Sequence, residues 1–358
     1  MVVGALPGLN DSITLAVLIP VTFGMNPQTA MCLLIGIYVS ACYGGSIPSI
    51  LLKIPGTASS VVTAFDGQPM TQKGKAGLAL SISTTSSVFG GIMSSLVLLF
   101  FSPFLAAQAL KFGPPEYLML AIMGMSTVVG MAGNAMLKNI LVMSLGLLIS
   151  CIGLTPQAGF SRLTFGNPYL LEGIPLVPML IGLFGVASIL ELIETTGGVK
   201  NITEKIQRVH VKMLDKEMCK RLLPTWMQSG IIGTLIGVIP GAGMIMAIYL
   251  AYDQARRANP DKEFGTGVPE GVAAPETANN AVVASSMVPL LALGVPGNAT
   301  SALFLGALMI QGLRPGPALY RDYPELAYLI VVGFLVAISS CCLWALHSAI
   351  FSLVRSFC

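Results

Sequence analysis

Charged side chains are scarce in this sequence. Asp, Glu, Lys and Arg together make up 10% of the 358 residues, whereas a soluble domain carries about a quarter. Hydrophobic residues make up 54%, and the mean hydropathy is +0.80. This composition excludes an ordinary soluble enzyme. It is typical of an all-α polytopic membrane protein, because lipid cannot satisfy the polar groups of irregular backbone.

Residues that bind metals or phosphates are also few. The two histidines are His210 and His347, and the seven cysteines show no C-x-x-C spacing, so we expect no metal site. The sequence has no G-x-x-x-x-G-K-[ST] loop for the phosphates of ATP. The net charge of +3 is small and localised, so nucleic acid is not an expected partner.

Long charge-free runs predict the membrane segments. A helix needs roughly 20 apolar residues to cross a bilayer, which gives about 10–11 segments here, in contact with lipid. Basic residues concentrate in 197–224, which we expect to be cytoplasmic, together with the polar segment 66–77. Between these two we expect four spans, at about 78–101, 117–133, 139–154 and 174–196. The segment 253–270 contains both acidic and basic residues, so its charges do not indicate on which side of the membrane it lies.

The chain contains an internal repeat. Residues 46–60 read SIPSILLKIPGTASS and residues 287–301 read MVPLLALGVPGNATS, 241 positions later, as from Pro48 to Pro289. A second pair, GALPG at 4–8 and GVIPG at 237–241, is 233 positions apart. We therefore expect a first repeat at 1–110, connecting spans and a basic loop at 111–224, and a second repeat at 225–358. An odd number of spans between the repeats predicts that they are inverted.

Each repeat has two Pro-Gly breaks within apolar sequence. They are Pro7-Gly8 and Pro55-Gly56 in the first repeat, and Pro240-Gly241 and Pro296-Gly297 in the second. Paired breaks at equivalent positions of two halves indicate a transporter's binding site near the membrane midplane. The alternative is that each Pro-Gly is a kink that packing tolerates.

The residues after the two later breaks are the candidate substrate site. A helix that begins there would direct free N–H groups and hydroxyls at a bound anion. The candidate residues are Gly56, Thr57, Ala58 and Ser59, and Gly297, Asn298, Ala299 and Thr300. Two such helix starts could bind the carboxylates of one substrate without a buried arginine.

Candidates for binding the coupling ion lie close to the breaks in sequence. Asn279 and Asn280, with free carbonyls and hydroxyls, could coordinate Na⁺. Asp66 either ends its segment or helps to bind the ion. Glu276 follows Pro275 near an expected segment start, where capping a helix N-terminus would explain an acid. The Lys53 side chain could attract an anion or extend to the membrane surface. Its repeat partner is Gly294, which argues against a shared side-chain role of these two positions.

Several longer motifs run through both halves of the chain. In the first half these are Tyr43-Gly44-Gly45-Ser46-Ile47-Pro48, Ile54-Pro55-Gly56-Thr57, Asp66-Gly67-Gln68-Pro69-Met70 and Lys73-Gly74-Lys75-Ala76-Gly77. In the second half they are Gly271 to Ala281 (GVAAPETANNA), Leu293 to Thr300 (LGVPGNAT) and Gly312 to Pro317 (GLRPGP). Together these motifs resemble those of the TctA family, the large subunits of the tripartite tricarboxylate transporters.

The resemblance implies a subunit of a carrier in the bacterial inner membrane. It implies a small TctB-like membrane subunit, a periplasmic TctC-like binding protein, citrate-like organic acids as substrates, and a Na⁺ or H⁺ gradient as the driving force, with no other cofactor. Chains of the family have more helix before the first Pro-Gly and further spans after the second repeat. We therefore expect this chain to be a truncated copy.

Two other functions are compatible with the sequence. Ser46 and His347 could form the dyad of an intramembrane serine hydrolase, although Ser46 aligns with Met287 in the repeat. A passive anion channel would differ from a carrier only in its lack of coupling to a gradient.

Overall fold

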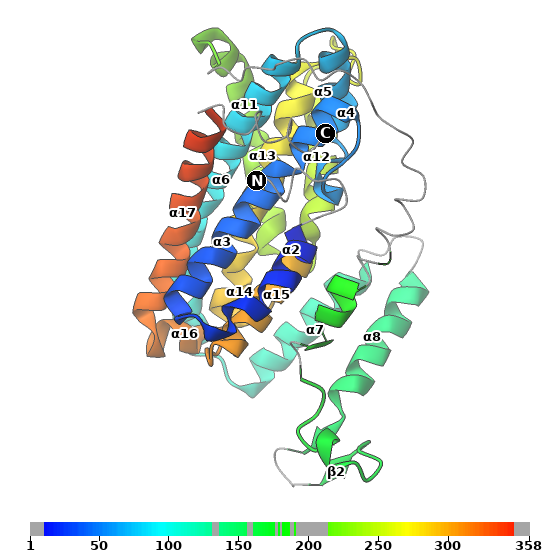
Figure 1. Ribbon diagram of the computed structural model, residues 1–358, viewed down its shortest axis with the longest axis vertical. Helices are drawn as coiled ribbons and strands as arrows, with labels where there is room; N and C mark the ends of the chain where they lie inside the picture. Colours follow the sequence, from blue (N-terminus) through cyan, green and yellow to red (C-terminus); the bar gives the residue numbers. More distant parts are fainter. Residues whose placement is uncertain are drawn as a thin grey trace.

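The structure is a computed structural model that describes residues 11–130, 136–155, 160–175, 178–179, 181–186, 190 and 214–346. In these ranges the fold is almost entirely helical (Figure 1). The sheet of the described part consists of β1 (Gly153–Leu154) paired antiparallel with β2 (Ser161–Arg162). The predicted all-α class is confirmed.

The helices follow one another with short connections. Before the sheet they are α2 (Asp11–Leu18), η1 (Pro20–Gly24), α3 (Pro27–Gly44), α4 (Ser46–Leu52), η2 (Ala58–Ser60), α5 (Thr63–Gln72), α6 (Ala76–Ala109), α7 (Pro114–Gly130) and α8 (Met136–Ser150). After it they are η4 (Pro168–Leu170), η5 (Ile181–Val186), α11 (Lys216–Val238), α12 (Gly243–Ala258), α13 (Pro269–Ser285), α14 (Met287–Leu293), α15 (Ala299–Ile310), α16 (Pro317–Asp322) and α17 (Pro324–Leu346).

Helix α13 lies at the centre of the helical body. It packs against α3, α5, α6, α11 and α12, and all its residues from Glu270 to Ser285 are buried. Its sequence is rich in small residues on every side, which allows neighbouring helices to approach closely. A Cβ added at Gly90 of α6 would clash with the Thr277 carbonyl, and one at Gly237 of α11 would clash with the Ser285 side chain. Glycines on the neighbours therefore permit this close packing.

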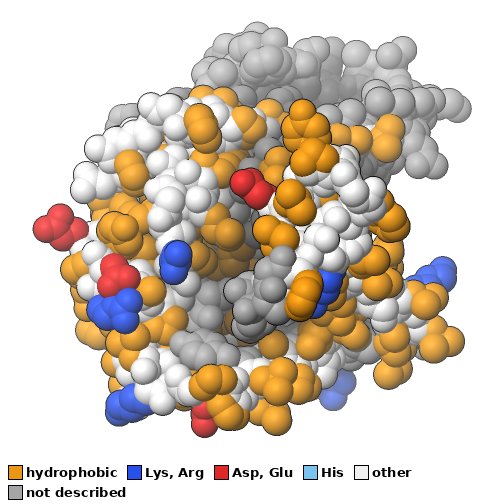
Figure 2. All heavy atoms as spheres, turned by 90° about the horizontal axis from the view of Figure 1, so that it is seen from below, with side chains coloured by type: hydrophobic (Ala, Val, Ile, Leu, Met, Phe, Trp, Pro, Cys, Tyr) orange, Lys and Arg blue, Asp and Glu red, His pale blue; other side chains and the backbone are white. Residues whose placement is uncertain are grey.

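The outer surface is apolar, as expected for contact with lipid. Three stretches are long and apolar enough to cross a membrane, namely Pro27–Leu52, Ala76–Ala109 and Pro324–Cys341. Large apolar side chains point outward from them, for example Phe100 on α6, which is 72% exposed. Seen from below, hydrophobic side chains cover most of the surface around a central hollow, and charges are few (Figure 2). These features agree with a membrane protein, and the number of about 10–11 spans stays a prediction.

Some boundaries differ from those expected. The polar segment 66–77 is not a loop, because α5 extends to Gln72 and α6 begins at Ala76. The last part of the basic segment forms the start of α11, so the boundary expected at 224 falls inside this helix. Helices α6, α7 and α8 correspond to the first three of the four expected spans. Most of the fourth span, and residues 197–213, lie outside the described residues.

The sequence repeat has a counterpart in local structure. Helices α4 and α14 are each seven residues long, and each ends in a left-handed residue, Lys53 (φ 60°) or Gly294 (φ 76°). The amides that follow donate equivalent hydrogen bonds, from Ile54 to the Pro48 carbonyl and from Val295 to the Pro289 carbonyl. Lys53 and Gly294 thus share a backbone role, which the sequence did not predict. Figure 1 shows α4 and α14 at opposite ends of the body.

Candidate functional site

The first break separates α4 from α5. After Pro55, the amide of Gly56 donates to the carbonyl of Gly45 (3.2 Å), which folds the chain back onto the start of α4. Thr57 then caps a single 3₁₀ turn, η2, and its amide donates to the Ser60 hydroxyl (3.3 Å). The helix expected to start at Thr57 is therefore only one turn long here, and α5 begins at Thr63.

The second break has a fully developed helix start. Asn298 caps α15 through a capping box, in which Ser301 N donates to Asn298 Oδ1 (2.7 Å) and Asn298 N donates to Ser301 Oγ (2.8 Å). The helix start predicted at this position is confirmed. The remaining amide hydrogens of Asn298 point at α3, where Nδ2 donates to Tyr38 Oη (3.1 Å).

The break at Pro240-Gly241 adjoins the second break. The amide of Gly241 donates to the carbonyl of Gly297 (2.9 Å), so two breaks 56 positions apart lie in direct contact. A Cβ at Gly297 would lie 2.8 Å from the Ser286 carbonyl oxygen, which explains why glycine is required there. The other predicted break, at Pro7 and Gly8, lies outside the described residues.

Only the first helical residue after each break is exposed. Ala58 and Ala299 are exposed, whereas Thr57, Ser59 and Thr300 are buried. A ligand could therefore reach these helix starts over a small alanine side chain. The two alanines are equivalent in the repeat, so both helix starts are open to a ligand in the same way.

A carboxylate of the chain itself lies against the second helix start. The Thr300 hydroxyl donates to Asp11 Oδ2 (2.6 Å), and the Ser12 hydroxyl lies 2.9 Å from Thr300 Oγ1. Cys42 Sγ lies 3.9 Å from the same Asp11 oxygen. Sequence reasoning did not single out Asp11. The only signal was an acid at the head of a long uncharged run.

Asp66 has a structural role that the sequence did not predict. Its Oδ1 accepts hydrogen bonds from the amides of Gly265, Gly267 and Val268 (2.8–2.9 Å), and Tyr252 Oη donates to Oδ2 (2.9 Å). These donors fix the loop that leads into α13. Asp66 lies in the first turn of α5 and does not end its segment, and its role as an ion ligand stays a prediction.

Asn279 and Asn280 are both buried in α13 but differ in their contacts. Asn279 Nδ2 donates to the carbonyl of Cys42 (3.5 Å), and its Oδ1 is buried without a hydrogen-bond partner in the part of the chain that the structure describes. Asn280 Nδ2 donates to the backbone carbonyl of Glu276 (3.1 Å). Asn280 also lines the small cavity described below, whereas the unpaired oxygen of Asn279 is fully buried.

Glu276 lies in the middle of α13 and does not cap a helix. The helix begins at Pro269, two turns earlier, so the capping interpretation was wrong. Glu276 Oε1 accepts from Ser46 (2.6 Å) and Thr63 (2.5 Å), and Oε2 accepts from Ser83 and Ser87 (3.0 Å each). The error arose because the expected spans were drawn between charged residues, which placed this acid at a segment end.

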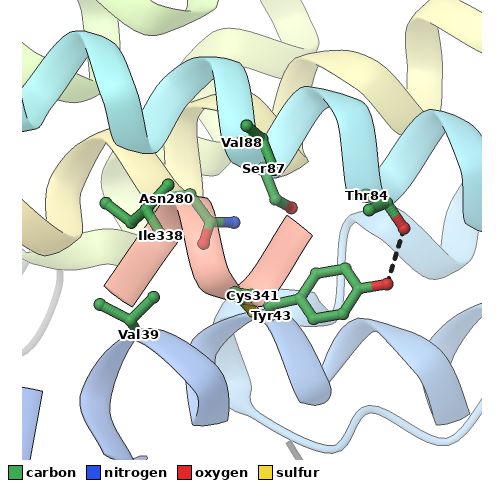
Figure 3. Close-up of a pocket in the computed structure, with 8 residues that line it drawn as sticks. All are labelled: Val39, Tyr43, Thr84, Ser87, Val88, Asn280, Ile338 and Cys341. Carbon is green, nitrogen blue, oxygen red and sulfur yellow. Dashed lines mark hydrogen bonds between the residues drawn. The ribbon is translucent and has the colours of Figure 1, made fainter. Parts of the chain in front are cut away.

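A small cavity adjoins this cluster (Figure 3). It has a volume of about 10 Å³, which is room for about one water molecule. Ser87, Asn280, Thr84 and Tyr43 line it, and Tyr43 Oη and Thr84 Oγ1 form a hydrogen bond (2.7 Å). Ser87 belongs both to the cavity wall and to the partners of Glu276.

Glu270, at the start of α13, has a different environment. Its carboxylate accepts from Arg221 (2.7 Å) and from Lys262 (2.8 Å), both partly exposed. Burial alone would raise the pKa of Glu270, but the hydrogen bonds from Arg221 and Lys262 outweigh it and lower the pKa. Glu270 is therefore an anion held by an ion-pair network at the end of the body.

Ser46 is not arranged as a nucleophile. Its hydroxyl donates to Glu276, and the predicted partner His347 lies outside the described residues. The described residues contain no cluster of three or more His, Cys, Asp or Glu side chains suited to a metal ion.

Comparison with known proteins gives one family. The model of the "Tripartite tricarboxylate transporter TctA family" matches residues 1–354. An Agrobacterium vitis protein described as "Uncharacterized 52.8 kDa protein in TAR-I ttuC' 3'region" is 39% identical over 332 residues, 92% of this chain and 66% of the relative.

A second relative from the same organism, "Uncharacterized protein in TAR-II ttuC' 3'region", is 41% identical over 102 residues, 28% of this chain and 42% of the relative. The chain thus matches less than two thirds of the length of either relative. No solved structure matches it. The family is one of transporters, not of enzymes, and the chain belongs to the tripartite tricarboxylate transporter TctA family.

Proposed function

We propose that this chain is the large membrane subunit of a secondary active transporter that takes up small di- and tricarboxylates, such as citrate, across the bacterial inner membrane. A Na⁺ or H⁺ gradient drives the uptake. A periplasmic TctC-like protein delivers the substrate, and a small TctB-like membrane subunit completes the complex. Membership of the TctA family supports this proposal.

The observation that carries the proposal is the matched structure of the two later breaks. Each has a short helix, a left-handed residue, Pro-Gly and a capped helical turn that starts at an exposed alanine. Helix starts with hydroxyls nearby suit carboxylates. We assign substrate binding to Gly56–Ser59 and Gly297–Thr300, within inverted repeats. The positions of α4 and α14 at opposite ends of the body support the inversion.

Asp11 has a clear part in this arrangement. Its carboxylate accepts a hydrogen bond from Thr300, so a substrate carboxylate would compete with it for that hydroxyl. Asn279, with its buried unpaired Oδ1, and Asn280, which lines the small cavity, are the candidate ligands for Na⁺.

The test is uptake of labelled citrate into liposomes that contain the purified protein, with and without the proteins encoded next to it. Thr57→Trp and Asn298→Trp should abolish uptake, because a large ring at either cap blocks a helix start. Ser339→Trp on the exposed face of α17 is the matched control and should transport normally. Full transport by both cap variants, inserted normally, would refute the site.

The same assay separates a carrier from a passive anion channel. A carrier accumulates citrate above the external concentration only when a Na⁺ or H⁺ gradient is imposed. Equilibration without accumulation under every gradient would favour the channel.

A further inference from the structure

We propose that Glu276 binds the coupling ion and that this ion is a proton. The proposal rests on the transport function proposed above and specifies its energy source. It also replaces Na⁺ coordination at Asn279 and Asn280 as the means of coupling.

The two oxygens of Glu276 contact different parts of the protein. Oε1 accepts from Ser46 on α4, before the first break, and from Thr63 on α5, after it. Oε2 accepts from Ser83 and Ser87, one turn apart on α6. Oε1 therefore links α4 and α5, the helices before and after the first break. Oε2 links both of them to the long helix α6.

The partners of Glu276 are suited to both of its protonation states. A hydroxyl can donate to a carboxylate or, after rotation, accept from a carboxylic acid. All four partners of Glu276 are hydroxyls, and no Lys, Arg or His among the described residues bonds to it. By contrast, Arg221 and Lys262 bind Glu270. Those donor groups cannot accept, so they hold an anion only.

The location also favours a proton over a metal cation. A lone charged carboxylate in a membrane protein interior is costly, and it becomes neutral by taking up a proton or by pairing with a cation. The four hydroxyl oxygens contact the carboxylate directly, at 2.5–3.0 Å. A proton can add to the carboxylate without separating these oxygens.

Proton binding requires one balanced step. A proton adds to Oε1, an O–H bond forms, and either Ser46 or Thr63 rotates from donor to acceptor. The reverse step releases the proton. The cavity beside Ser87 has room for about one water molecule next to this partner of Glu276.

No other titratable group competes closely with Glu276. Helices α6 and α14 and the η2 turn, which pack against α13, contain none. The titratable residues on the other packed elements are Cys32, Tyr38, Cys42 and Tyr43 on α3, Asp66 on α5, Lys216, Glu217, Cys219, Lys220 and Arg221 on α11, and Tyr249, Tyr252, Asp253, Arg256 and Arg257 on α12. Of these, Cys42 interacts electrostatically with Glu276, and Tyr43 is bonded to Thr84.

A change in the hydrogen bonds of Glu276 Oε1 would alter the proposed substrate site. Ser49 lies one turn after Ser46 on α4, and its hydroxyl donates to Ser60 Oγ (2.7 Å). Ser60 in turn donates to the carbonyl of Thr57 (2.8 Å), the cap of η2. Rotation of the Ser46 or Thr63 hydroxyl would shift α4 or α5, the helices on either side of the first break. Proton binding and substrate binding are therefore linked.

Two measurements test the proposal. Infrared difference spectra of the purified protein at varied pH should show the band of a protonated carboxylic acid, and Glu276→Gln should lose it. In liposomes, Glu276→Gln should still exchange labelled citrate for unlabelled citrate but lose accumulation driven by a pH gradient. Thr85→Ala is the control, because the Thr85 hydroxyl bonds to a carbonyl of its own helix.

A second pair of variants covers the case in which Glu276→Gln does not fold. Ser83→Ala and Ser87→Ala each remove one hydrogen bond to Oε2, so the pH at which the carboxyl band disappears should change, whereas Thr85→Ala should leave it unchanged. An unchanged pH in both serine variants would overturn the proposal.

The remaining outcomes are equally decisive. Two results would overturn the proposal that Glu276 binds a coupling proton. One is normal pH-driven accumulation of citrate by Glu276→Gln. The other is accumulation by the parent protein with a Na⁺ gradient and not with a pH gradient. If the parent protein moves no citrate under any condition, the proposed function is contradicted instead, and the infrared band still decides whether Glu276 binds a proton.

Discussion

Lys53 and Gly294 occupy the same turn in the two halves of the chain, and one of them is a lysine in a left-handed conformation. This conformation costs an ordinary residue about 1–2 kcal/mol, whereas glycine adopts it freely. The left-handed turn is what allows the chain to leave α4 and α14 and enter the two breaks. Strain at Lys53 is therefore part of the structure of the first break.

Replacing Lys53 with glycine and replacing Gly294 with alanine should affect the stability of the protein differently. Lys53→Gly should stabilise the protein or leave it unchanged, within about 1 kcal/mol, because relief of strain is offset by greater freedom of the unfolded chain. Gly294→Ala should destabilise it by about 1–2 kcal/mol. Thermal unfolding in detergent measures both. An equal loss of stability in both variants would contradict the shared backbone role.

Glu270 should make stability depend on pH in a definite direction. Its pKa lies below the usual 4.5 in the folded protein, so its contribution is present above that pH and is lost as the pH falls through the folded value. Glu270→Gln should cost about 1–3 kcal/mol at neutral pH. The difference in stability between parent and variant should shrink as the pH falls below 4.5. A difference that is constant over this range would count against the ion-pair network.

At the scale of helices, the packing of α6 on α13 rests on one glycine. A Cβ at Gly90 would overlap the Thr277 carbonyl, a rigid backbone group, whereas a Cβ at Gly36 of α3 would meet nothing within 4 Å. Gly90→Ala should therefore destabilise the protein by about 1–3 kcal/mol. Gly36→Ala should be neutral or stabilise by up to about 1 kcal/mol. The midpoints of thermal unfolding of the two variants test this contrast, and equal midpoints would show that α6 can move aside.

Part of this arrangement could be predicted from the sequence. The repeat and its Pro-Gly dipeptides predicted where helices break, and the start of α15 at Asn298 follows from local capping chemistry. Helix α5 was missed because Gly67 and Pro69 suggested a turn. The structure explains Gly67 by close packing, since a Cβ there would lie 2.8 Å from the Ile50 side chain. The partners of Asp66 and Glu276 lie about 200 positions away, so no local pattern could predict them.

At the scale of the whole molecule, polar contacts join the two repeats in both directions. Glu276 of the second repeat bonds to Ser46 and Thr63 of the first. Asp11 of the first repeat bonds to Thr300 of the second. The expected division into 1–110 and 225–358 therefore describes the repeat and not two separate bodies. A movement of one break changes contacts that the other half provides.

The proposed inverted arrangement predicts which polar turns share a side of the membrane. The turn after α5 and the turn after α15 are equivalent, because each ends its helix at a left-handed glycine, Gly74 (φ 72°) or Gly312 (φ 74°). In inverted repeats these turns face opposite sides. The loop before α13 shares the side of the first turn, since Lys73 Nζ donates to the Thr266 carbonyl (2.5 Å). If the segment 66–77 is cytoplasmic, so is the loop 259–268.

Labelling of single cysteines, in a variant without native cysteines, tests this topology. Lys73, Asp261 and Arg314 are all exposed. With a membrane-impermeant maleimide, Lys73→Cys and Asp261→Cys should react from the same side, and Arg314→Cys only from the other. Because the Lys73–Thr266 contact already places Lys73 at the same end as the loop that carries Asp261, agreement between these two variants is the internal control. Reaction of all three cysteines from one side of the membrane would refute the inverted repeat. It would also refute the proposal that the two substrate-binding breaks enter the membrane from opposite faces.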